Sequence, residues 1–323
     1  MSMEKIVLQK TDLQVSKIAL GTADYGTKYS QEVAFAQMDM FAENGGNLID
    51  TAYVYGSWIP GMGNISERVI GNWMKERKNR NHIIVSTKGA HPALENVMIS
   101  RVYPKEIVKD MEDSLRGLQT DYIDLYFLHR DNPDFPAVEI LGCLEEQVKK
   151  GNIRYYGCSN WRLPRIMEAQ QAAKQENFKG FVCNQLMYSL ATADKNKLWD
   201  PTLVMMDNET YENHRDEKWN VMAYMAAAKG YLIKKIRGQK AEAMSAEAYG
   251  TKANERLAEY LEDLEKEGYA PDEVSLAYLM QQNLLTVPVV SFSKREQLQA
   301  AFRSCEIKLP AEVMGRLEQL RTK

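Results

Sequence analysis

Four side chains that can transfer a proton or hold a charge follow short hydrophobic segments in the first half of the sequence. Asp50 and Tyr55 lie close together, while Lys88 and His129 each end a later segment. Each residue has an ordinary structural explanation, such as a turn cap, a surface ring, an ion pair or a satisfied polar group. Together, a carboxylate, a phenol, an ammonium and an imidazole can protonate a carbonyl oxygen and stabilise its developing charge.

The physical chemistry of these groups predicts how they would cooperate in carbonyl reduction. A phenol ionises near pH 10 in water, which makes it too weak an acid to work unaided. An ammonium beside it favours the phenolate, so Lys88 would lower the pKa of Tyr55 toward the working pH. Asp50 would keep Lys88 protonated, and His129, as a neutral or charged donor, would orient the carbonyl oxygen.

These side chains can meet only if the segments that carry them share one sheet. Short β-like segments alternate along the chain with longer segments of helical periodicity. Strands are expected at Ile18–Gly21, Asn47–Asp50, His82–Lys88, Tyr122–His129, Ile153–Ser159, Phe181–Leu186, Val221–Met225 and Thr286–Phe292. Helices are expected at Gln31–Asn44, Ser66–Arg77, Lys105–Leu118, Ala137–Lys150, Leu163–Gln175, Asp207–Trp219, Asn254–Glu267, Asp272–Gln282, Lys294–Arg303 and Ala311–Leu320.

Eight alternations of strand and helix fit either a closed parallel barrel or a doubly wound sheet. The segment Gly21–Gly26 lacks the spacing of a G-x-G-x-x-G turn, which weakens the doubly wound alternative. We therefore expect an α/β (β/α)8 TIM barrel, forming a single domain over residues 1–323. A β-hairpin of Ile6–Gln9 and Leu13–Lys17 would precede it, and the last helix would be an addition at its C-terminal end. In such a barrel, polar residues at the C-terminal ends of the strands converge on one face.

The composition excludes several classes of partner. The 323 residues are 45% hydrophobic and 26% charged, as in an ordinary globular protein, and 41 basic against 44 acidic residues give a net charge of −3. The balance predicts neither a nucleic-acid nor a membrane partner. With neither an apolar leader nor a membrane-spanning segment in the sequence, a cytoplasmic protein is expected. The four cysteines show no metal-ligand spacing, so no metal is expected.

Several short motifs resemble those of one known family, and the resemblance extends over nearly the whole chain. The motifs are Gly45–Ala52 with Tyr55–Gly56, Ser66–Glu67, Ile70–Gly71, Thr87–Lys88, Asp121–Tyr126 with Leu128–His129, Gly157–Asn160 and Asn184–Gln185. With them, the sequence resembles the aldo-keto reductase superfamily. The resemblance implies a catalytic tetrad of Asp50, Tyr55, Lys88 and His129. It also implies a pyridine nucleotide bound in extended form, mainly NADPH, with NADH possible.

The resemblance also implies which residues contact the cofactor. The amides and hydroxyl of Ser159, Asn160 and Gln185 suit the nicotinamide carboxamide, and Tyr224 would stack on the ring. Further cofactor contacts are implied for Gly21 and Thr22. After the last strand, the helix start with Ser291, Ser293, Lys294 and Gln297 offers backbone amides that suit phosphate. Lys294 and Arg295 would add charge for a 2′-phosphate, which favours NADP over NAD.

The segment after Tyr55 would lie at the mouth of the barrel and contact a small-molecule carbonyl substrate. Trp58 and Trp161 could form an aromatic wall there, with Asp24 adding polar recognition. This mixture suits a sugar-like or otherwise hydroxylated carbonyl. The sequence specifies neither the substrate nor the oligomeric state.

Two other functions fit parts of the pattern. A nucleotide-sensing or regulatory protein could keep the barrel and lose turnover, but all four tetrad positions are filled here. A barrel aldolase could use Lys88 in a Schiff base. Asp50 and Tyr55 in the neighbourhood of Lys88 favour the reductase over the aldolase.

Overall fold

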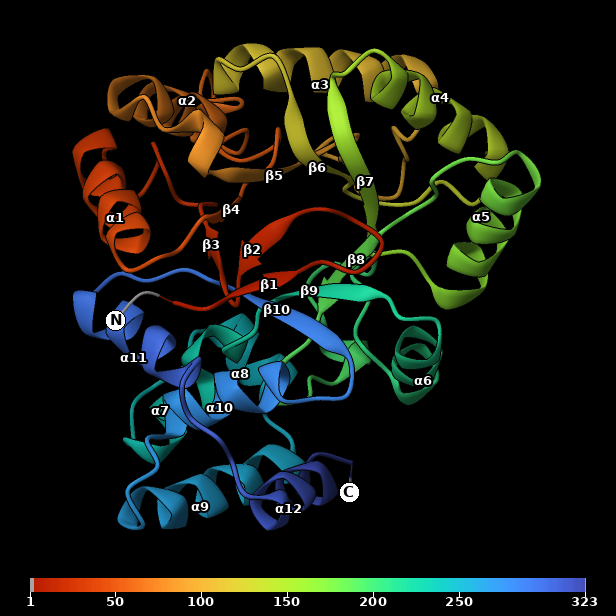
Figure 1. Ribbon diagram of the computed structural model, residues 1–323. Coiled ribbons are helices and arrows are strands. Elements are labelled where there is room, and N and C mark those ends of the chain that lie inside the picture. The colour runs from red at the N-terminus through yellow and green to blue at the C-terminus, as the bar shows by residue number, and fades with distance from the viewer. Residues whose placement is uncertain (1–2, 323) are drawn as a thin grey trace. The chain divides into compact units, whose positions relative to one another are not determined.

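The computed structural model describes residues 3–322 of the chain, whose strands build a closed parallel barrel. The strands follow the order β10-β3-β4-β5-β6-β7-β8-β9 (Figure 1). Before the barrel, β1 (Lys5–Val7) and β2 (Gln14–Ser16) pair antiparallel in a separate two-stranded sheet. The predicted (β/α)8 fold with its N-terminal hairpin is therefore confirmed.

The chain divides into two compact units, Met1–Gln185 and Leu186–Lys323, which are described separately. A single domain over residues 1–323 stays a prediction. In the first unit, the barrel strands are β3 (Ala19–Gly21), β4 (Leu48–Asp50), β5 (Ile84–Gly89), β6 (Ile123–Leu128) and β7 (Ile153–Ser159), and β8 (Cys183–Met187) spans the boundary. The helices of this unit are α1 (Gln31–Glu43), α2 (Ile65–Arg77), the short 3-10 helix η1 (Arg80–His82), α3 (Pro104–Leu118), α4 (Ala137–Lys149) and α5 (Leu163–Gln175).

Burial explains why these segments take the observed form. All six residues of β6 are buried, as expected for a parallel strand covered on both faces. Helix α3 begins with Pro104, which suits the first turn, and buries Ile107, Met111 and Leu118 on one stripe. The expected strand at residues 82–88 starts later, because His82 ends the 3-10 helix η1.

The strand register places the C-terminal ends of β4, β5 and β6 side by side. Asp50 on β4 pairs with Ser86 on β5, and Lys88 on β5 pairs with Phe127 on β6. Because the strands are parallel, their C-terminal ends lie at the same edge of the sheet. This edge carries the candidate site residues of the first unit.

In the second unit, β9 (Asn220–Tyr224) and β10 (Leu285–Val290) pair in parallel. The helices are η2 (Lys195–Lys197), α6 (Asn208–Asp216), η3 (Ala228–Gly230), α7 (Tyr231–Ile236), α8 (Ala243–Tyr249), α9 (Lys252–Lys266), α10 (Pro271–Met280), α11 (Arg295–Ser304) and α12 (Ala311–Thr322). Helices α9 and α12 pack side by side (Figure 1). The sequence pattern missed α7 and α8, since helices of 6 and 7 residues are too short to show a clear period.

Two structural features bear on the class of protein. Within residues 3–322, no helix has the length and apolar character needed to cross a membrane. In the same range, no group of three or more His, Cys, Asp or Glu side chains is arranged to hold a metal ion.

Candidate active site

The structure brings Asp50, Tyr55, Lys88 and His129 together at the C-terminal ends of β4, β5 and β6. The ammonium of Lys88 lies 2.8 Å from Oδ2 of Asp50 and donates to the carbonyl of Thr51 at 2.6 Å. Asp50 and Lys88 are buried. A buried ion pair of this kind is stable only when further hydrogen bonds satisfy its remaining polar atoms.

The second oxygen of Asp50 has its own donors. Ser86 Oγ donates to Oδ1 at 2.7 Å, and Gln185 Nε2 donates to the same atom at 2.9 Å. These bonds fix the carboxylate in place. Gln185, which the sequence assigns to the cofactor, is thus also a neighbour of the tetrad.

The electrostatic balance at Lys88 keeps it charged. Burial alone would lower the pKa of Lys88, but the Asp50 carboxylate and the Tyr55 phenol outweigh burial and raise that pKa. The ammonium is therefore retained across the physiological range. This agrees with the expectation that Asp50 holds Lys88 protonated.

Tyr55 lies in the turn after β4, and its ring is half-buried. Its ring centroid is 5.1 Å from Lys88 Nζ and 6.1 Å from the ring centroid of His129. Burial raises the pKa of Tyr55, while Lys88 acts in the opposite direction and lowers it. Lys88 thus lowers the pKa of Tyr55 as expected from the sequence, but burial prevails and the phenol stays protonated at neutral pH.

His129 follows β6 and is buried beside Tyr55. Burial, followed by His91, Arg130 and Lys88, lowers the pKa of His129 well below its usual value. The imidazole is therefore neutral near pH 7, with one nitrogen as donor. This favours the neutral of the two forms that the sequence leaves open.

A buried carboxyl group lies behind the tetrad and was not among the expected site residues. Glu67 on α2 is fully buried and accepts a hydrogen bond from Thr87 Oγ1 at 2.5 Å. Burial raises the pKa of Glu67 to about 7. Its neighbour Ser66 bonds the hydroxyls of Thr22 at 2.9 Å and Thr51 at 2.8 Å. The only sequence signal for this network was the Ser66–Glu67 motif.

Gly21 and Thr22 support the tetrad from β3. Gly21 pairs with Asp50 in the strand register, and Thr22 Oγ1 donates to the Asp50 carbonyl at 2.9 Å. The Thr22 side chain is buried. These bonds give both residues a role in holding β4, and their contact with a cofactor stays a prediction.

The residues expected at the nicotinamide group form a connected set at the ends of β7 and β8. Asn160 takes a left-handed backbone with φ of 59°, and its amide nitrogen donates to Gln185 O at 3.2 Å. Asn160 Nδ2 also donates to Ser159 Oγ at 3.0 Å. Hydroxyl and amide groups are therefore gathered in the same unit as the tetrad, where they suit a carboxamide.

The remaining expected cofactor residues belong to the second unit. Tyr224 ends β9, half-buried, and its carbonyl accepts from Tyr188 N at 3.2 Å. At the start of α11, Gln297 Oε1 accepts from Ser293 N at 2.9 Å and from Lys294 N at 3.1 Å. Gln297 therefore caps the helix. It binds the backbone amides that were expected from the sequence to bind a phosphate group. The side chains of Ser291, Ser293 and Lys294 are exposed.

The expected substrate residues have different surroundings. Trp58 is 48% exposed, and its ring centroid lies 6.4 Å from that of Tyr55. Trp161 is fully buried: it packs on Phe181, and its Nε1 donates to Arg130 O at 2.9 Å. This favours a packing role for Trp161, whose contact with substrate stays a prediction, as does that of the partly exposed Asp24.

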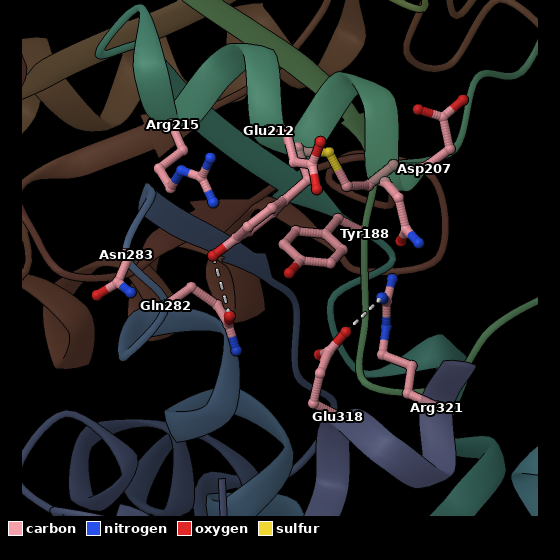
Figure 2. A pocket seen from close by; sticks show the side chains of 11 residues that line it. Tyr188, Asp207, Glu212, Arg215, Gln282, Asn283, Glu318 and Arg321 are labelled. Carbon is pink, nitrogen blue, oxygen red and sulfur yellow. Dashed lines mark hydrogen bonds and ion pairs between the residues drawn. The ribbon is translucent and has the colours of Figure 1, made fainter. Parts of the chain in front are cut away.

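A cleft of about 320 Å³ lies within the second unit and lacks comparable chemistry. Figure 2 shows Tyr188, Glu318 and Arg321 on its walls. Its polar groups bond to one another: Tyr211 donates to Gln282 Oε1 at 3.2 Å, and Arg321 pairs with Glu318 at 4.0 Å. The tetrad in the first unit is therefore the candidate active site.

Comparison with known proteins identifies the family. Residues 17–322 match the model of the aldo/keto reductase family. The chain belongs to this family. An uncharacterized oxidoreductase, YrpG, of Bacillus subtilis is 32% identical over 98% of this chain and 96% of its own length.

Two other known proteins are similar over most of the chain. Norsolorinic acid reductase B of Dothistroma septosporum is 27% identical over 95% of this chain and 78% of its own. The protein tas of Escherichia coli is 27% identical over 95% and 94% of the two chains. Membership of this family makes the chain an oxidoreductase, for which the tetrad is the candidate active site.

Proposed function

We propose that this protein reduces an aldehyde or ketone to the alcohol with NADPH, using Tyr55 as general acid. One observation carries the proposal: a phenol, a neutral imidazole and a buried ammonium–carboxylate pair meet at one edge of the barrel. Lys88 Nζ, 2.8 Å from Asp50 and 5.1 Å from the Tyr55 ring, is the centre of this arrangement.

The chain itself supplies the proton and the electrostatic stabilisation. A bound nicotinamide cofactor would supply the hydride that reaches the carbonyl carbon. Tyr55, protonated because burial raises its pKa, donates its proton to the carbonyl oxygen. Lys88 then stabilises the phenolate that remains, and Asp50 holds Lys88 in place. His129, neutral, donates a hydrogen bond that orients the carbonyl oxygen.

The side chains of the first unit suit the proposed cofactor. Ser159, Asn160 and Gln185 gather hydroxyl and amide groups beside Asp50, and these groups can bind a carboxamide as donors and acceptors. In the second unit, exposed Lys294 and Arg295 at the start of α11 provide charge for a 2′-phosphate. This supports NADPH as the preferred nucleotide.

The substrate is proposed to be a small carbonyl compound that contacts Trp58. The exposed Trp58 ring beside Tyr55 offers an apolar surface next to the proton donor. A related protein is named as a reductase of norsolorinic acid, which agrees with reduction as the reaction class.

The decisive experiment measures NADPH consumption with a panel of aldehydes and ketones, with Trp fluorescence reporting nucleotide binding. Turnover that depends on Tyr55 supports the proposal. Nucleotide binding without consumption of any carbonyl would favour the regulatory alternative. Trapping of a substrate on Lys88 by borohydride would favour the aldolase instead.

A further inference from the structure

We propose that His91 is a positioning residue for the reduction, whose ring holds the imidazole of His129 in place. The inference rests on the proposed function, in which His129 orients the carbonyl oxygen. His91 follows β5 at three residues from Lys88, and the sequence argument gave it no role.

The ring of His129 is held by packing. Its Nδ1 is buried and has no hydrogen-bond partner among the described residues. The last side-chain torsion of histidine has broad energy wells, so a ring without a bond at Nδ1 needs neighbours to define its orientation. Two rings serve this purpose: Tyr55, with centroids 6.1 Å apart, and His91, with centroids 4.7 Å apart and planes at 73°.

His91 is the closer of the two rings and is itself fixed. Its side chain is buried, and Nδ1 lies 2.7 Å from the carbonyl oxygen of Pro92. Because a carbonyl oxygen can only accept, Nδ1 of His91 carries the proton in this contact. The tautomer and the tilt of the His91 ring are thereby set. Its edge-to-face contact in turn fixes the orientation of the His129 imidazole.

An ion pair between the partly exposed Arg101 and the buried Asp110 holds the backbone on both sides of His91. Asp110, which is fully buried, accepts from Ala90 N at 2.8 Å and binds Arg101 through two nitrogens at 2.9 and 3.1 Å. Arg101 Nη1 in turn donates to the carbonyl of His91 at 2.9 Å. Ala90 has a left-handed backbone with φ of 56°, a strained conformation that these bonds maintain. The loop is built to place the next side chain against His129.

His91 also affects the pKa of His129. The rings of Tyr55 and His91 contact the imidazole. After burial, His91 has the largest influence in lowering the pKa of His129, followed by Arg130 and Lys88. A proton on either ring disfavours a proton on the other. His91 therefore helps to keep His129 a neutral donor as well as a fixed one.

The test compares His91→Phe, which keeps a ring of similar shape, with His91→Ala, which removes it. NMR of the imidazole nitrogens measures the pKa and tautomer of His129 in each enzyme. The chain has only 4 histidines, so a His129→Gln sample assigns the signal. Kinetics add kcat, KM and the pH profile, and fluorescence adds the dissociation constant of NADPH.

We expect His91→Ala to lower kcat roughly ten- to a hundredfold, since small misplacements of catalytic groups cost this much. KM and NADPH binding should change less than about twofold, because ground-state contacts remain. His91→Phe should recover most of kcat, and in both variants the pKa of His129 should rise. An unchanged His129 signal and kcat in His91→Ala would overturn the proposal. An equal loss of kcat in His91→Phe and His91→Ala would also overturn it, because a ring of the same shape would then not position His129.

Thermal unfolding identifies a variant that fails to fold. If His91→Ala does, His91→Gln takes its place and is read by the same criteria. The NMR measurement needs no turnover, so it separates this inference from the proposed function. A wild-type enzyme that consumes no NADPH refutes the reduction, whereas a His129 signal insensitive to His91 refutes the positioning role.

Discussion

Lys88 and Asp50 form an ion pair that is almost wholly removed from water. Nζ and Oδ2 are 2.8 Å apart, and the two side chains are only 1% and 3% exposed. A charge left alone in such a place has neither solvent nor partner to stabilise it. The two residues therefore act as one unit, on which the position and charge balance of Tyr55 depend.

We expect each of Lys88→Met and Asp50→Asn to lower the free energy of unfolding by about 3–5 kcal/mol, as in other buried pairs that lose one partner. The double variant should lose clearly less than the sum, because no lone charge remains. Each single variant should also lose activity. The double variant should not regain it, because Tyr55 then lacks the Lys88 ammonium. Chemical denaturation of the four proteins measures the coupling.

The exposed pair Lys266–Asp263 is a matched control, with the same 2.8 Å separation but side chains 68% and 66% exposed. Its coupling should be below about 1 kcal/mol. Equal coupling in the two pairs, or additive losses at Lys88 and Asp50, would contradict a shared buried environment.

Tyr55→Phe should remove carbonyl reduction and leave NADPH binding nearly intact. The substitution deletes the acidic proton and keeps the ring, so the loss in kcat should be roughly 10²–10⁴-fold, the usual contribution of a general acid. Steady-state kinetics and a fluorescence titration with NADPH test the two halves of the prediction.

Tyr53→Phe is the control, because this neighbouring phenol donates to Asp113 at 3.2 Å and is not part of the tetrad. It should keep kcat within a few-fold of the wild type. Near-normal turnover by Tyr55→Phe would exclude the phenol as the acid.

Much of this site follows from the sequence because strand ends are readable from hydrophobic segments. The residues Asp50, Lys88 and His129 each lie at or just beyond a strand end, and parallel strands bring such ends together. The alternation of strand and helix fits either a parallel barrel or a doubly wound sheet, and the lack of a G-x-G-x-x-G turn favours the barrel. Both predictions depend on local patterns that tertiary contacts reinforce.

What the sequence does not specify is where a side chain points and what it bonds. Gln185 donates to Asp50 and Gln297 caps its own helix, two bonds that the sequence does not predict, while the contact of both residues with a cofactor stays a prediction. Trp161 is buried where an open wall was expected. His91 meets His129 only because Ala90 takes a left-handed backbone, which a non-glycine residue rarely adopts.

NADPH should bind roughly ten- to a hundredfold more tightly than NADH, since one charge-assisted contact contributes about 1.5–3 kcal/mol. The exposed side chains of Lys294 and Arg295 are the proposed source of this preference. Joint replacement of both by Ala should bring the two dissociation constants close together. Lys308→Ala, an exposed cation in the segment before α12, is the control and should change neither. Equal constants in the wild type would mean that these cations do not contact the nucleotide.

Glu67 should make the stability of the protein depend on pH. Burial raises its pKa to about 7 from an ordinary value of 4.5. The folded state thus binds the proton more tightly than the unfolded chain. The resulting stabilisation is full below pH 4.5 and is lost as the pH rises to about 7. By this linkage, the free energy of unfolding should fall by on the order of 3 kcal/mol across that window.

Glu67→Gln should abolish this slope, because an amide of the same shape cannot ionise and can still accept from Thr87. The variant should match the wild type near pH 5 and be more stable than it above pH 7, as measured by urea denaturation across this range. Glu312→Gln, at an exposed position on α12, should leave the slope unchanged. A constant difference between Glu67→Gln and wild type from pH 5 to pH 8 would mean that Glu67 is already ionised in the folded protein. In that case a neighbouring positive charge, with Lys88 the nearest candidate, would have to compensate the buried carboxylate.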